Sequence, residues 1–168
     1  MGVIGIILGN VCSLLAMITD SISATRKTAK GVLIFQSLSQ VIYGTGAILL
    51  KGYSSAVQNA VSLLRNFVAI RKVNSALVEW ILVILGVVLG LWFNNLGLVG
   101  WLPVIANFQY TLAVFQFKDN ERALKFSFVI CVGMFVIFNV VILNIVGACS
   151  NLIVMITTLV MLLKKKKD

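Results

Sequence analysis

The chain has 168 residues, of which 60% are hydrophobic and only 11% charged, with a mean hydropathy of +1.06 and a formal net charge of +9. A soluble domain of this length could not cover so much apolar surface with so few charges, so the composition predicts an all-α integral membrane protein. The positive charge does not indicate nucleic-acid binding, because the basic residues stand mostly between apolar runs, with few aromatic residues among them.

Apolar runs follow one another along the chain, and most approach the length of about 20 residues that a helix needs to cross a bilayer. The expected spans are Gly2–Thr19, Gly31–Leu50, Ser54–Ile70, Leu77–Phe93, Leu98–Phe117, Phe126–Leu143 and Ala148–Leu163. Polar segments from Asp20 to Lys30 and from Lys118 to Lys125 are expected to be loops. Seven spans leave only short connections, with no room for a separate catalytic domain.

The third run is the least apolar, because it contains Gln58, Asn59, Arg65 and Asn66. The distribution of charge supports it nevertheless. If all seven runs cross the bilayer, every one of the 14 lysines and arginines except Lys51 and Arg65 falls on one side. Basic loops stay in the cytoplasm. We therefore expect the amino terminus outside and the carboxyl terminus in the cytoplasm.

The two ends of the chain share a pattern of loops. A shift that places Gly2 on Gly97 also places Gly52 on Gly147 and Ser55 on Ser150. This predicts two parallel three-helix repeats, residues 1–72 and 97–168, joined by a linker transmembrane helix in residues 73–96. The second repeat would end in a lysine-rich cytoplasmic tail. The 3+1+3 arrangement is similar to SWEET/PQ-loop and PnuC-like transporters, in which a substrate site lies between the repeats.

Three stretches, Ser55–Lys72, Trp101–Lys118 and Phe138–Leu163, resemble the YgjV-type family of bacterial inner-membrane proteins. The resemblance implies a multi-pass protein of the inner (plasma) membrane. It carries no established activity, so a transport function depends on architectural analogy.

Arg65 lies inside a predicted span, where a charge costs at least about 2.5 to 3.5 kcal/mol. Its side chain can extend to the cytoplasmic interface, bond to backbone carbonyls, or hold an anionic or carbonyl-bearing solute through its planar guanidinium. Polar residues recur at helical spacing around it and in the second half of the chain. They can bond between helices or line a solute cavity, and the candidate solute-binding residues are Gln58, Asn59, Arg65, Asn107, Asn139 and Asn151.

The titratable residues favour a facilitator over a proton-driven carrier. The chain has no histidine, and the five carboxylates are expected at or near the cytoplasmic side, with none deep in a helix. Proton-driven carriers usually need a buried titratable relay. We expect a facilitator for a small polar solute that works by alternating access, with Pro103 as a hinge.

Other classes of function are less favoured. No metal site or cofactor is expected, because the three cysteines lie in apolar runs without CxxC spacing, and the chain is not expected to be an enzyme. The alternative is a non-transporting receptor, lipid-binding or assembly protein that uses a basic cytoplasmic face. Lys164–Lys167 would contact anionic lipid. Gly5-x-x-x-Gly9 and Gly86-x-x-x-Gly90 suggest close helix contacts, or a homo-oligomer.

Overall fold

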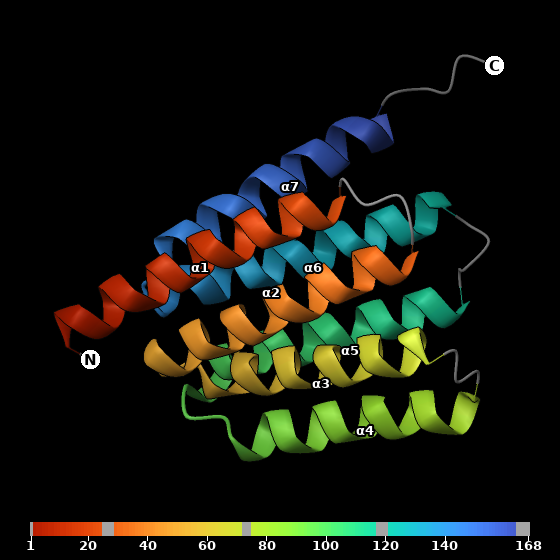
Figure 1. Ribbon diagram of the computed structural model, residues 1–168, viewed down its shortest axis with the longest axis horizontal. Helices are drawn as coiled ribbons and strands as arrows, with labels where there is room; N and C mark the ends of the chain where they lie inside the picture. Colours follow the sequence, from red (N-terminus) through yellow and green to blue (C-terminus); the bar gives the residue numbers. More distant parts are fainter. Residues whose placement is uncertain (1, 25–28, 72–74, 117–120, 164–168) are drawn as a thin grey trace.

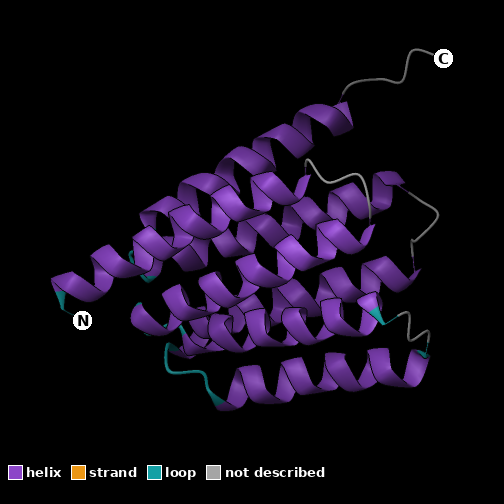
Figure 2. Cartoon of the chain, viewed as in Figure 1, coloured by secondary structure: helices purple, strands orange, loops and turns teal. Residues whose placement is uncertain are grey.

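The computed structural model describes residues 2–24, 29–71, 75–116 and 121–163, and these residues contain helices and turns but no strand (Figures 1 and 2). Seven α-helices confirm the all-α prediction. Their bounds are α1 (Val3–Ala24), α2 (Ala29–Leu49), α3 (Tyr53–Ile70), α4 (Ala76–Trp92), α5 (Trp101–Gln116), α6 (Glu121–Val141) and α7 (Ile145–Leu163). A 3₁₀ helix, η1 (Gly97–Gly100), precedes α5.

Two helices extend into segments that were expected to be loops. Helix α1 continues past Asp20 to Ala24, and α6 begins at Glu121 rather than Phe126. Polar residues can continue a helix by bonding to its backbone, as Ser21 does when its Oγ donates to Met17 O at 2.9 Å. Several basic residues expected at the cytoplasmic side lie outside the described residues, namely Arg26, Lys27, Lys72, Lys118 and Lys164–Lys167.

Six of the helices form a closed ring. Each helix packs against the next along the chain, and α1 also packs against α7 while α3 packs against α5. The order around the ring is therefore α1, α2, α3, α5, α6, α7. Helix α4 lies outside the ring against α3 and α5, at the lower edge of Figure 1.

Helices α1, α3, α5 and α7 run in one direction, and α2, α4 and α6 run back (Figure 1). We call the end of the bundle that holds the turns at 50–52 and 142–144 the amino end, and the opposite end the carboxyl end. Lys51 lies at the amino end. Arg71, after α3, and Lys125, in the first turns of α6, lie at the carboxyl end.

The burial pattern is the reverse of that in a soluble protein. Large apolar side chains point outward, with Trp92 81% and Leu98 87% exposed, whereas Ser39 and Ser54 are completely buried. Soluble monomers rarely expose a contiguous apolar patch of more than a few hundred Å². The outer surface therefore suits a hydrocarbon environment.

By length and apolar composition alone, one helical segment in the described residues, Val3–Ile22, could cross a membrane. Shorter apolar segments are Leu33–Leu49, Ala76–Trp92, Lys125–Val141 and Ile145–Val160. Helix α3, whose sequence interrupts its apolar run with Gln58, Asn59 and Arg65, is not among them.

Glycines allow close helix contacts in two places. On α2, a Cβ at Gly46 would lie 2.9 Å from Cys12 Cβ and 3.1 Å from Gly9 O on α1. On α4, Gly86 and Gly90 are buried against α3 and α5. Both glycine motifs of the sequence thus contribute at least one glycine to packing between helices of the same chain.

Replacement of Gly90 by alanine is expected to destabilise the fold by about 1–3 kcal/mol. The new Cβ would lie 2.5 Å from Gln58 Nε2 and 2.7 Å from Val104 Cγ2, so either these side chains must move, which breaks the Gln58 hydrogen bonds, or α4 must shift outward. Gly86→Ala is the matched control, because its Cβ would meet Gln58 Oε1 and Val61 Cγ1 at an ordinary 3.5 Å. Thermal unfolding in detergent compares the two variants. Equal stability would show that α4 does not pack as described.

The turns after α2 and α6 have the same geometry. Lys51 and Leu143 adopt left-handed conformations, with φ of 56° and 60°. The next N–H donates five residues back, from Gly52 to Ala47 O at 2.7 Å and from Asn144 to Asn139 O at 2.8 Å. The turn geometry therefore makes Gly52 equivalent to Asn144, whereas the sequence shift aligns it with Gly147.

Candidate functional site

The ring is closed at the amino end by an apolar cluster. Leu50, at the end of α2, packs with Phe138 and Ile142 of α6, and all three are almost completely buried. Because α2 and α6 are not adjacent in the ring, this contact crosses its interior. Gly52 allows the close approach, since a Cβ there would lie 3.1 Å from Phe138 Cζ.

Asparagine side chains hold the two turns at the same end. Asn95 Nδ2 donates to Lys51 O at 2.8 Å, and Asn10 Nδ2 donates to Leu143 O at 2.8 Å. Asn10 Oδ1 also accepts from the Val146 N–H at 3.0 Å, near the start of α7. Asn10 of α1 therefore binds the turn after α6, and Asn95, which lies between α4 and η1, binds the turn after α2.

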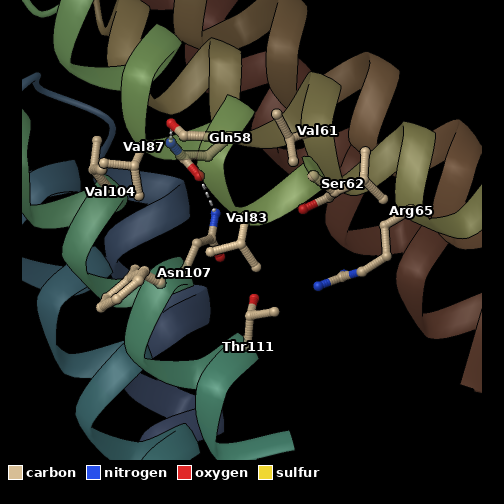
Figure 3. Close-up of a pocket in the computed structure, with 12 residues that line it drawn as sticks. Gln58, Val61, Ser62, Arg65, Val83, Val87, Val104, Asn107 and Thr111 are labelled. Atoms are coloured by element: carbon tan, nitrogen blue, oxygen red, sulfur yellow. Dashed lines mark hydrogen bonds between the residues drawn. The ribbon is translucent and has the colours of Figure 1, made fainter. Parts of the chain in front are cut away.

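A pocket of about 30 Å³ lies between α3, α4 and α5 (Figure 3). A cavity needs about 10–15 Å³ of accessible volume to hold one water molecule, so the pocket has room for about two waters in this conformation. Its lining residues are Gln58, Val61, Ser62, Arg65, Leu82, Val83, Gly86, Val87, Val104, Asn107, Phe108 and Thr111. Helices from both halves of the chain and the linking helix thus meet at this pocket.

A chain of hydrogen bonds crosses one side of the pocket. Gln58 Nε2 donates to Gly86 O at 2.8 Å, and Asn107 Nδ2 donates to Gln58 Oε1 at 3.1 Å (Figure 3). A backbone carbonyl can only accept, so the Gly86 contact determines which end of the Gln58 amide donates. The Gln58 oxygen must then accept, which orients the Asn107 amide and leaves Asn107 Oδ1 for another donor.

Arg65 extends from α3 into the pocket toward Thr111 of α5 (Figure 3). Its guanidinium lies near Tyr110 and Cys131, but it has no hydrogen bond or ion pair with any residue in the described ranges. Arg65 is exposed, so the pocket is open on this side. Arg71 differs, because its guanidinium lies over the Phe67 ring at 5.1 Å from the ring centre.

The other predicted binding residues lie apart from the pocket. Asn59 Nδ2 donates to Ser55 O on its own helix at 3.0 Å. Asn139 Oδ1 accepts from Asn144 Nδ2 at 2.9 Å in the turn at the amino end. Asn151 is partly buried on α7 and is not a lining residue. Of the six candidates, the structure thus brings together Gln58, Arg65 and Asn107.

Pro103 is completely buried and lies in the first turn of α5. A proline there removes no hydrogen bond that the helix would otherwise make, so its position requires no kink. Its predicted role as a hinge stays a prediction.

Thr111 was missed as a pocket residue. It lies one helical turn after Asn107, so both residues share one face of α5. Its spacing from Asn107 was the one signal that could have identified it.

One carboxylate lies deeper in the bundle than expected. Asp20 is part of α1 and falls inside the candidate span Val3–Ile22. Its carboxylate accepts a hydrogen bond from Ser39, a completely buried residue in the middle of α2. The expectation that Asp20 begins a loop was wrong, because α1 continues to Ala24, but Asp20 still lies near the carboxyl end of the bundle.

Replacement of Asn107 by leucine is expected to lower stability by about 1–3 kcal/mol, the cost of an unsatisfied buried polar group. Leucine is close to asparagine in size, but it cannot donate to Gln58 Oε1. The control is Asn151→Leu, since the Asn151 side chain makes no hydrogen bond among the described residues. Unfolding of the two variants in detergent should differ. Equal stability would contradict the proposed amide orientation.

The family model Imp-YgjV, described as a bacterial inner membrane protein, matches residues 7–168. The chain therefore belongs to this family, as the sequence comparison predicted. No curated protein and no solved structure matches the chain. Its similarity to SWEET/PQ-loop and PnuC-like transporters accordingly remains a matter of sequence pattern.

Proposed function

We propose that this member of the bacterial inner membrane protein family is a carrier for a small polar solute, which binds in the pocket between α3, α4 and α5. The observation that carries the proposal is the guanidinium of Arg65, which extends into the pocket without an ion pair in the described part of the chain. A charge in a span is costly, and it is retained where it binds a ligand or a partner.

The proposed arrangement in the membrane is seven spans in a 3+1+3 architecture. Residues 1–72 and 97–168 form the repeats and residues 73–96 the linker, with the amino end outside and the carboxyl end in the cytoplasm. The identical turns at Lys51 and Leu143 support the repeats, and the positions of Arg71 and Lys125 support the orientation. Anionic lipid at the cytoplasmic side would contact the basic residues.

Alternating access is the proposed mechanism. The cluster of Leu50, Phe138 and Ile142 closes the ring at the amino end, whereas Arg65 is exposed nearer the carboxyl end. This asymmetry is what a carrier open to one side requires. Rocking of one three-helix unit against the other would separate the cluster and open the ring at the amino end. Access to the pocket from that end also requires α3 and α5 to move apart, because the pocket lies between them and the outer helix α4.

The position of Asp20 weakens the reason for preferring a facilitator. Its partly buried carboxylate, near the end of the candidate span and bonded to Ser39, is a titratable group of the kind that a proton-coupled carrier uses. The proposal is therefore a carrier without assignment to the facilitator class. Uptake measured with and without an imposed pH gradient distinguishes the two classes.

The test is uptake of labelled solutes into liposomes that hold the purified protein. Sugars, nucleosides, vitamins and small carboxylates are compared with protein-free liposomes. A carrier shows saturable uptake of at least one class. Absence of uptake by correctly inserted protein would favour the rival function, a membrane receptor, lipid-binding or assembly protein, and would make the polar contacts elements of packing alone.

A further inference from the structure

We propose that the ligand of the Arg65 pocket is a small carboxylate that also carries a hydrogen-bond donor, such as a 2-hydroxy acid or an amino acid. This inference rests on the proposed function and specifies its substrate class. It depends on two complementary features of the lining, a free cation and a free acceptor.

Arg65 supplies the requirement for an anion. It is the one charged residue among those that line the pocket, and no carboxylate lines it. A guanidinium presents its N–H groups in a planar fork that matches the two oxygens of a carboxylate. A neutral polyol would leave the charge of this cation uncompensated.

Asn107 supplies the requirement for a donor. The hydrogen bonds from Asn107 to Gln58 and from Gln58 to Gly86 O fix the orientation of both amides. Asn107 Nδ2 is therefore occupied, whereas Asn107 Oδ1 accepts no hydrogen bond from the described residues. An oxygen in this position is satisfied by a ligand O–H or N–H. A simple carboxylate such as acetate has neither at neutral pH.

The hydroxyl groups of Ser62 and Thr111 complete the polar lining. A hydroxyl can donate or accept, so these residues are compatible with either end of the ligand. The volume of about 30 Å³ restricts the ligand to the smallest members of this class. Even glycolate or glycine, with more atoms than the two waters that fit in this conformation, requires the pocket to widen when it binds.

The test is equilibrium binding to the purified full-length protein in detergent, measured by saturation-transfer NMR. The probes are glycolate, glycine, acetate and ethylene glycol. Glycolate and glycine are expected to bind about tenfold more tightly than acetate, the value of one hydrogen bond to a site that would otherwise hold an unpaired acceptor. Ethylene glycol, which has donors but no charge, should bind more weakly still.

Two variants assign these preferences to their residues. Arg65→Gln should weaken glycolate and acetate alike, by about tenfold or more. Asn107→Leu should remove the preference for glycolate over acetate. If Asn107→Leu does not fold, the relative affinities of the four probes for the wild-type protein still test the proposed ligand class.

Equal binding of acetate and glycolate, or tightest binding of ethylene glycol, would overturn the assigned ligand class. Failure of the ligand class is distinguishable from failure of the transport proposal. Binding of glycolate or glycine without uptake would support the proposed ligand class but contradict the carrier function. Saturable uptake of a solute without a carboxylate, together with no binding of glycolate or glycine, would support the carrier and contradict this ligand class.

Discussion

Replacement of Phe138 by alanine is expected to lower the free energy of unfolding by about 3–5 kcal/mol, the range for loss of a large aromatic side chain from a packed interior. Phe138 is completely buried and packs with Leu50 and Ile142 across the ring. Helices from both halves of the chain meet at this side chain, so little can collapse into the cavity without moving one half against the other. Unfolding in a mixed-detergent titration measures the effect.

Phe126→Ala is the matched control for this prediction. Phe126 lies on the same helix, but it is 61% exposed on the outer surface. Its loss should change stability by much less than the loss of Phe138. If the folded Phe138→Ala variant also makes liposomes leaky to the solute, the cluster closes the path as well as stabilising the fold. Similar losses of stability in both variants would show that Phe138 has no special place in the packing.

Replacement of Arg65 by glutamine is expected to lower the initial rate of saturable uptake by about tenfold or more, because a charge-assisted contact with the solute is lost. Glutamine keeps some of the length and the polarity of the side chain but not the charge. Arg65→Lys should retain part of the rate, since lysine supplies the charge without the planar fork. Liposomes with equal amounts of inserted protein provide the comparison.

Arg71→Gln is the control, because Arg71 also belongs to the end of α3 but lies over Phe67 and does not line the pocket. Its uptake should remain near that of the wild type. A similar loss in both variants would indicate a general requirement for positive charge at the carboxyl end. No loss in either variant would remove Arg65 from the solute path.

The number of helices and the all-helical fold were predictable. A helix in a membrane must pair its own backbone N–H and C=O groups and present apolar side chains over most of its length, and such runs are visible in the sequence. Even α3 was found, through the charges that flank it. The helix bounds were less predictable where polar residues bond to a helix backbone or to a neighbouring helix. Asp20 was assigned to a loop because it is charged, although it lies inside α1 and bonds to Ser39 of α2.

The candidate site was predictable only in part. Helical spacing placed Gln58 and Arg65 on one face of α3, but no pattern within one helix shows which neighbour that face meets. The ring order decides this, and it brings Asn107 and Thr111 to Gln58 and Arg65, while Asn139 lies in the last turn of α6 and bonds to Asn144 in the turn at the amino end. Polarity alone could not separate an asparagine that orders a turn from one that faces a pocket.

The central claim is that one pocket is exposed alternately to the two sides of the membrane, and counterflow tests it most directly. Liposomes holding the protein are preloaded with unlabelled solute and diluted into a trace of the same labelled solute, with glycolate as the first choice. A carrier predicts that preloading accelerates entry of the label and transiently accumulates it, because each outward step returns an accessible site. Entry at the same rate with and without preloading, in liposomes where uptake is established, would contradict alternating access.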